Sequence, residues 1–141
     1  MGWFATRQRF FKPDKIRIAF LVITVGAFFI TELGRNVYRP FIRSNGIQDF
    51  GIADSIGNLG GIIVQIFFIC AILNPSRIQS YRWAGFLSVG YIAYEFVQPY
   101  LPRGVFDWKD IFGTLIGFTI SLIILWSIWY IYPPKDESEN N

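Results

Sequence analysis

Four long apolar stretches follow one another along the chain, separated by short polar segments. The pattern predicts membrane-spanning helices at residues 18–34, 54–73, 81–98 and 110–132. The last is the clearest, because it contains about twenty apolar or small residues in a row, enough to cross the hydrocarbon core of a bilayer. We therefore expect an all-α integral membrane protein with four transmembrane helices.

The segments between these stretches set the expected boundaries. Residues 36–51 are predicted to be a polar connection, in which Pro40 and Asn45-Gly46 break any long helix. Residues 74–77, with the sequence Asn-Pro-Ser-Arg, are predicted to form a turn. The domain organisation is then a basic segment at 1–17, a membrane domain at 18–132 and an acidic tail at 133–141, which we expect to be disordered.

Composition supports the membrane class. Hydrophobic residues make up 52% of the 141 residues and charged residues only 16%, whereas a soluble domain carries about 25% charged residues. The chain has no basic stripe, so nucleic acid is not an expected partner. It lacks His and has a single Cys, which argues against metal sites built from these residues. No cofactor is expected, although a Mg²⁺ or Ca²⁺ ion could be held by carboxylates.

Lysine and arginine distribution predicts the orientation. The side that carries both chain ends has the larger set, Arg7, Arg9, Lys12, Lys15, Arg17, Arg77, Arg82 and Lys135. The other side has the smaller set, Arg35, Arg39, Arg43, Arg103 and Lys109. Both termini are therefore expected to be cytoplasmic, with the second set outside.

An eight-residue pattern, D-x-x-G-[N/T]-L-x-G, occurs at residues 54–61 and again at 110–117. Each copy opens an apolar span, and the preceding span ends in a glutamate, which suggests two repeated helical hairpins. The two glycines of each copy are four residues apart and form a small-xxx-small pattern that lets helices approach closely. We expect the second and fourth spans to cross at Gly57, Gly61, Gly113 and Gly117. That crossing would bring the two leading aspartates together at the outer mouth.

Polar residues near this outer end are the candidate binding residues. They are Glu32, Arg35, Asp54, Asn58, Glu95, Gln98, Arg103, Asp107, Asp110 and Thr114. Charges beside apolar helices are costly in lipid and often functional. Helix N-termini with arginine suit a phosphate or carboxylate, whereas clustered carboxylates suit a cation, a proton or an amine.

Simpler interpretations remain open for several of these charged residues. Asp54 and Asp110 could be helix N-caps, and Glu32–Arg35 could be a neutralised pair. The charges of Arg39, Arg43 and Lys109 could be solvated loop charges.

The stretch from Glu95 to Gly117, which holds most of these polar residues, resembles part of a known protein family. Glu95-x-x-Gln98, Pro102-Arg103 and Asp107-x-x-Asp110-x-x-x-Thr114-x-x-Gly117 resemble the signature of the VanZ-like proteins. These are small bacterial inner-membrane proteins named for low-level resistance to the glycopeptide teicoplanin. The family usually has Asn where this chain has Thr114, and it often has a His in the second span, which this chain lacks. The resemblance implies location in the bacterial inner membrane.

Three classes of function are compatible with these features. The first is binding of an envelope lipid or a lipid-linked cell-wall precursor at the outer mouth, with an effect on teicoplanin susceptibility. The second is an enzyme acting on lipid head groups, with Glu95 or Asp110 as acid or base. The third is a small transporter or accessory subunit, which would need a homo-oligomer or a partner membrane protein.

Overall fold

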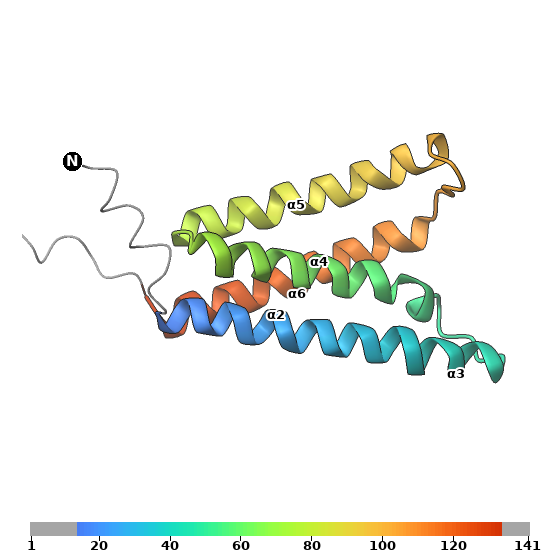
Figure 1. Cartoon of the computed structure of the whole chain (residues 1–141), viewed down its shortest axis with the longest axis horizontal. Helices are drawn as coiled ribbons and strands as arrows, with labels where there is room; N and C mark the ends of the chain where they lie inside the picture. The colour runs from blue at the N-terminus through green and yellow to red at the C-terminus, as the bar shows by residue number, and fades with distance from the viewer. Residues whose placement is uncertain (1–13, 134–141) are drawn as a thin grey trace, which may run out of the picture.

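The computed structural model describes residues 14–133, and within that range it contains helices and no strand. The long elements are α2 (Lys15–Leu33), α4 (Ile52–Leu73), α5 (Arg77–Val97) and α6 (Trp108–Ile131). The short ones are the π-helix η1 (Gly34–Tyr38), α3 (Arg39–Ser44) and the 3₁₀ helix η2 (Gln98–Tyr100). Figure 1 shows the four long helices running up and down the same axis. The sequence-predicted N-terminal segment up to residue 13 and the tail from residue 134 lie outside the described residues.

Three helices of the described chain are long and apolar enough to cross a membrane, namely residues 15–44, 52–73 and 108–131. These helices suggest a membrane protein, in agreement with the class predicted from the sequence. The remaining long helix, α5, has 21 residues but is less apolar than the others and does not reach the same hydropathy.

The first helix is longer than predicted. The expected polar connection over residues 36–51 is wrong for its first half, because α2, η1 and α3 follow one another without a break as far as Ser44. Within η1 the hydrogen bonding widens, and the N–H of Arg39 donates to the carbonyl of Gly34, five residues back. Pro40 follows at the start of α3. Since proline has no N–H and crowds the carbonyl four residues back, the wider turn before it lets the helix continue.

The apolar core lies in the half of the bundle that holds the two described chain ends. The ring of Phe20 contacts those of Phe67 and Trp129 there, at centroid distances of 6.0 and 6.5 Å. The indole Nε1 of Trp129 donates a buried hydrogen bond of 3.0 Å to Ser80 Oγ, which joins α6 to α5. The opposite half of the bundle contains the buried carboxylate of Glu95.

The central helix α4 packs against both α2 and α6. A methyl group added at Gly113 would lie 2.6 Å from the carbonyl oxygen of Ser55, and one added at Gly117 would overlap the carbonyl oxygen of Leu59. The glycines of α6 therefore lie directly on the backbone of α4, as the crossing prediction requires.

On α4 itself the crossing prediction is wrong. A methyl group at Gly57 would meet nothing within 4 Å, and one at Gly61 would face the Tyr91 hydroxyl of α5 at 3.3 Å. The glycine of α4 that a neighbouring helix does crowd is Gly60, which lies against Thr31 of α2. Because Gly57 and Gly61 are four residues apart, they share one face of α4, and that face is turned towards α5.

Candidate functional site

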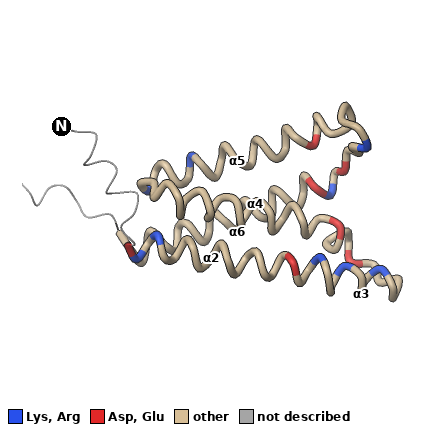
Figure 2. The backbone as a smooth tube through the Cα atoms, in the orientation of Figure 1, with Lys and Arg blue, Asp and Glu red and all other residues tan. Residues whose placement is uncertain are grey.

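Charged residues gather at the two ends of the bundle, and the length between them carries few (Figure 2). We call the end opposite the described chain ends, residues 14 and 133, the distal end. It is formed by η1 and α3, the first turns of α4 and α6, and the last turn of α5 with η2. The sequence-predicted candidates fall at this end, but they form separate contacts.

Asp54, in the first turn of α4, binds three cationic side chains from other elements. Its Oδ1 accepts from Arg43 Nη2 at 2.8 Å and from Arg39 Nη2 at 3.4 Å. Its Oδ2 accepts from Lys109 Nζ at 2.8 Å. We call Arg39, Arg43 and Lys109 the basic cluster. Asp54 thus joins all three cations, and other carboxylates lie within electrostatic range of them, Asp49 and Asp107 near Lys109 and Asp110 near Arg39. The Arg43 side chain is 61% exposed.

The helix caps are made by other aspartates. Asp49 accepts from the backbone N–H groups of Gly51 and Ala53, at 3.1 and 2.6 Å, and so closes the start of α4. Asp107 accepts from the N–H of Lys109 at 2.9 Å and caps α6. The interpretation of Asp54 and Asp110 as N-caps is therefore wrong, since both lie inside the first turn. Their charges still suit the positive end of the helix dipole.

Glu95, near the end of α5, is almost completely buried, with 2% of its surface exposed. Its Oε1 accepts from Asn58 Nδ2 of α4 at 3.2 Å. The backbone amide of Asp107 approaches the same carboxylate, but Oε2 has no partner with hydrogen-bond geometry among the described residues. Two predicted candidates thus meet directly across helices, and the second carboxylate oxygen of Glu95 is buried without a hydrogen-bond partner among the described residues.

A pocket of about 320 Å³ lies between α4 and α5 beside this carboxylate. It is lined by Asn58, Gly90, Tyr91, Tyr94, Glu95 and Gln98. We call it the Glu95 pocket. The predicted candidate Gln98 therefore reaches this pocket and not the basic cluster.

Asp110 lies between the basic cluster and the Glu95 pocket. It is within electrostatic range of Glu95 on one side and of Asp54 and Arg39 on the other. Thr114, predicted to line the mouth one turn below, is fully buried and donates its hydroxyl to the Asp110 carbonyl at 2.9 Å. Thr114 is therefore a packing residue, and its placement at the mouth is wrong.

Other predicted candidates stand apart. Arg35 pairs with Glu32 on the same helix at 3.2 Å, and Asn36 also donates to Glu32, at 3.0 Å. This agrees with the simpler interpretation of a neutralised pair. Arg103 lies in the turn after η2, exposed and with a left-handed backbone (φ 66°). It contacts neither the basic cluster nor Glu95 through any hydrogen bond or ion pair of the described chain.

Two buried polar side-chain atoms of the described chain lack a hydrogen-bond partner, Arg39 Nε and Glu95 Oε2. Both belong to the distal end. Buried polar atoms are nearly always paired, so these two atoms are the positions of the distal end at which a further hydrogen-bond partner can be accommodated. Arg39 offers an N–H to an anion, and Glu95 offers an oxygen to a donor group.

The basic cluster is the part of the site that sequence reasoning missed. The simpler interpretation as solvated loop charges is wrong about their location, because these partly exposed side chains lie on helices and all three contact Asp54. Arg39 and Arg43 are four residues apart, which places them on one face of a helix. The four-residue spacing of the two arginines can be seen in the sequence, but it places them on one helix face only if the helix continues through Pro40.

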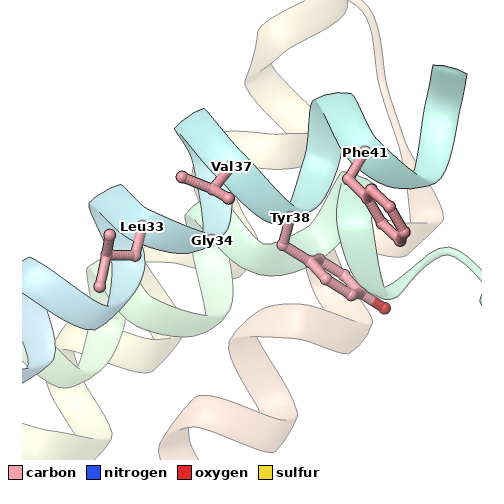
Figure 3. Close-up of a pocket in the computed structure, with 5 residues that line it drawn as sticks. All are labelled: Leu33, Gly34, Val37, Tyr38 and Phe41. Atoms are coloured by element: carbon pink, nitrogen blue, oxygen red, sulfur yellow. The ribbon is translucent and has the colours of Figure 1, made fainter.

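A second, apolar hollow of about 440 Å³ lies on the first helix near the basic cluster. Figure 3 shows its lining, Leu33, Gly34, Val37, Tyr38 and Phe41. Tyr38 donates its hydroxyl to Asp49 at 3.4 Å and so joins the edge of this hollow to the loop before α4. Tyr38 therefore belongs both to the lining of this hollow and to the contacts of the loop that precedes α4.

No group of three acidic, histidine or cysteine side chains within the described residues could hold a metal ion. The carboxylates of the distal end are distributed over two regions and do not converge on one point. Comparison with protein-family models, curated proteins and solved structures returned no match. The interpretation of the site therefore depends on its geometry.

Proposed function

We propose that this chain is a four-crossing membrane protein whose distal end binds the phosphate-bearing head group of an envelope lipid or lipid-linked cell-wall precursor. The observation that carries the proposal is the basic cluster with its unpaired, buried Arg39 Nε. Arginine forks are well suited to phosphate, and the lysine adds a third cation. The apolar hollow on the same helix offers a surface for the lipid chain.

The fourth crossing would be α5. Its 21 residues are long enough for a bilayer, and it runs alongside the other long helices (Figure 1). Its lower hydropathy comes in part from polar groups that the bundle itself covers, such as Ser80, Ser88 and Glu95. Polar residues in a membrane helix commonly face the bundle interior.

The location in a bacterial inner membrane, the VanZ-like relationship and the cytoplasmic termini belong to the same proposal. If the bound lipid is a wall precursor, its sequestration would change the access of glycopeptides such as teicoplanin. A homo-oligomer or a partner membrane protein would be compatible with the exposed apolar helix faces.

Lipid retention tests the binding proposal. Native mass spectrometry of the detergent-purified protein would compare wild type with Arg43→Ala, which leaves Arg39 and Lys109 to hold Asp54. The matched control is Arg82→Ala, an exposed arginine at the other end of the bundle. We expect a defined phosphate-bearing lipid in wild type and in the control, and its loss in Arg43→Ala. Equal retention by both variants would contradict the proposal.

Cysteine labelling tests the fourth crossing separately. In a Cys70→Ala background, single cysteines at Ser76 and at Arg103 flank α5. A membrane-impermeant maleimide applied to intact cells should label the second position alone if α5 crosses the membrane. Equal labelling of both positions would show that α5 does not cross.

A further inference from the structure

The Glu95 pocket differs from the basic cluster in the sign of its charges. The charged side chains that act on Glu95 are Asp110 and Asp107, both acidic. Those bound to Asp54 are all basic. The distal end therefore has an acidic region between α4 and α5, whereas the cations of the basic cluster lie around Asp54, with Asp49, Asp107 and Asp110 within their electrostatic range. A ligand that reaches both places can put a cationic group at Glu95 and an anionic group at the basic cluster.

The available acceptor in the anionic region is well defined. Glu95 is 98% buried, since only 2% of its surface is exposed. Asn58 holds Oε1 at 3.2 Å, which orients the carboxylate and leaves Oε2 without a hydrogen-bond partner in the described chain. A carboxylate removed from water gains most from a cationic hydrogen-bond donor.

The lining of the pocket also favours a cation over a neutral hydroxyl group. Tyr91 and Tyr94 supply aromatic rings, and the faces of such rings attract ammonium groups. Gln98 adds an amide oxygen that can accept a second hydrogen bond. Gly90 carries no side chain on the lining of this space, and a methyl group at Gly90 would meet nothing within 4 Å.

We propose that the Glu95 pocket binds a primary ammonium group, so that the ligand of the distal end is a zwitterionic lipid head group of the phosphoethanolamine type. This inference rests on the proposed function, because it places the ammonium group on the same lipid whose phosphate binds the basic cluster. The ammonium donates to Glu95 Oε2 and lies against the tyrosine rings.

The test compares lipids with the same acyl chains and phosphate but with a free amine, an acetylated amine or no amine. The purified protein would be titrated by native mass spectrometry with dioleoylphosphatidylethanolamine, with its N-acetyl derivative and with dioleoylphosphatidylglycerol. Wild type should prefer the free amine over the N-acetyl form by about tenfold, the usual effect of one hydrogen bond to a charged group. Glu95→Gln should remove this preference and still bind phosphatidylglycerol, whereas Glu32→Gln, at an exposed carboxylate, should keep it.

If Glu95→Gln does not fold, a second pair of variants tests the pocket by filling it with a bulky side chain. Gly90→Leu would fill the pocket, and Gly85→Leu changes the same helix at a glycine that also has open space around it. We expect loss of the amine preference in Gly90→Leu alone. Wild-type binding of all three lipids with equal affinity would overturn the ammonium site and leave the phosphate proposal intact. Binding of none of them would overturn both.

Discussion

The two copies of the D-x-x-G-[N/T]-L-x-G pattern allow one prediction to be worked out in depth, because equivalent glycines have opposite surroundings. Gly57 of α4 and Gly113 of α6 occupy the same position of the pattern. An added methyl group meets nothing within 4 Å at Gly57, but at Gly113 it lies 2.6 Å from Ser55 O and 2.9 Å from Ser55 Cβ. Replacement of either glycine by alanine is the same chemical change, so the surroundings alone distinguish the variants.

The magnitude follows from two opposing effects. Alanine is favoured over glycine in a helix by about 1 kcal/mol, and this gain applies to both variants. Overpacking against α4 costs about 1–3 kcal/mol, and it applies to Gly113→Ala alone. Gly57→Ala should therefore be stabilised by up to about 1 kcal/mol, and Gly113→Ala should be about 1–3 kcal/mol less stable than Gly57→Ala.

The assay is a reversible SDS titration in mixed micelles, followed by circular dichroism, with both variants and wild type measured together. Gly117→Ala extends the comparison, because its methyl group would overlap the Leu59 carbonyl, and it should behave like Gly113→Ala. Equal stability of Gly57→Ala and Gly113→Ala would refute the reasoning, since it would mean that α6 does not lie on the backbone of α4.

Three further predictions test other contacts. Asp54→Asn should lower the unfolding midpoint in low salt, and the loss should shrink at high salt because the ion pairs it breaks are screened; a loss independent of salt would contradict the contacts. Ser80→Ala leaves the buried indole N–H of Trp129 unpaired and should lower the free energy of unfolding by about 1–3 kcal/mol. Adding Trp129→Phe to Ser80→Ala should lower the free energy of unfolding by no more than Trp129→Phe does in the wild-type protein. Glu32→Gln breaks an exposed pair with Arg35 and should change stability by less than about 0.5 kcal/mol; a larger loss would mean that this pair is buried in the membrane-embedded protein.

Helix positions were largely predictable, because long apolar runs between turn residues specify them. The error lay at Pro40, and its cause is physical. A proline ends a regular α-helix, but a π-turn directly before it removes the conflict, and nothing in the residues Gly34–Tyr38 announces such a turn. The consequence extends to the site, because the continued helix carries Arg39 and Arg43 to Asp54.

The candidate site was predictable as a region and not as a set of contacts. Lipid disfavours charge, so the acidic residues had to lie near a helix end, and the spacing placed Asp54, Glu95 and Asp110 at the same one. Which side chain meets which depends on how each helix is rotated about its axis. The apolar pattern constrains that rotation weakly in a bilayer, where a lipid-facing side is also apolar.

The two copies of the sequence pattern differ in the charged side chains that they contact. In the first hairpin the glutamate, Glu32, is neutralised by Arg35 within its own helix, and the aspartate, Asp54, is neutralised by the basic cluster. In the second hairpin the equivalent residues, Glu95 and Asp110, bind no cationic side chain among the described residues. Because α4 occupies the centre and contacts α2, α5 and α6, the two copies cannot have equal neighbours. The asymmetry of packing thus gives the two copies of the pattern different charged neighbours, and the binding that we propose, of a phosphate at the basic cluster and an amine at Glu95, depends on this difference.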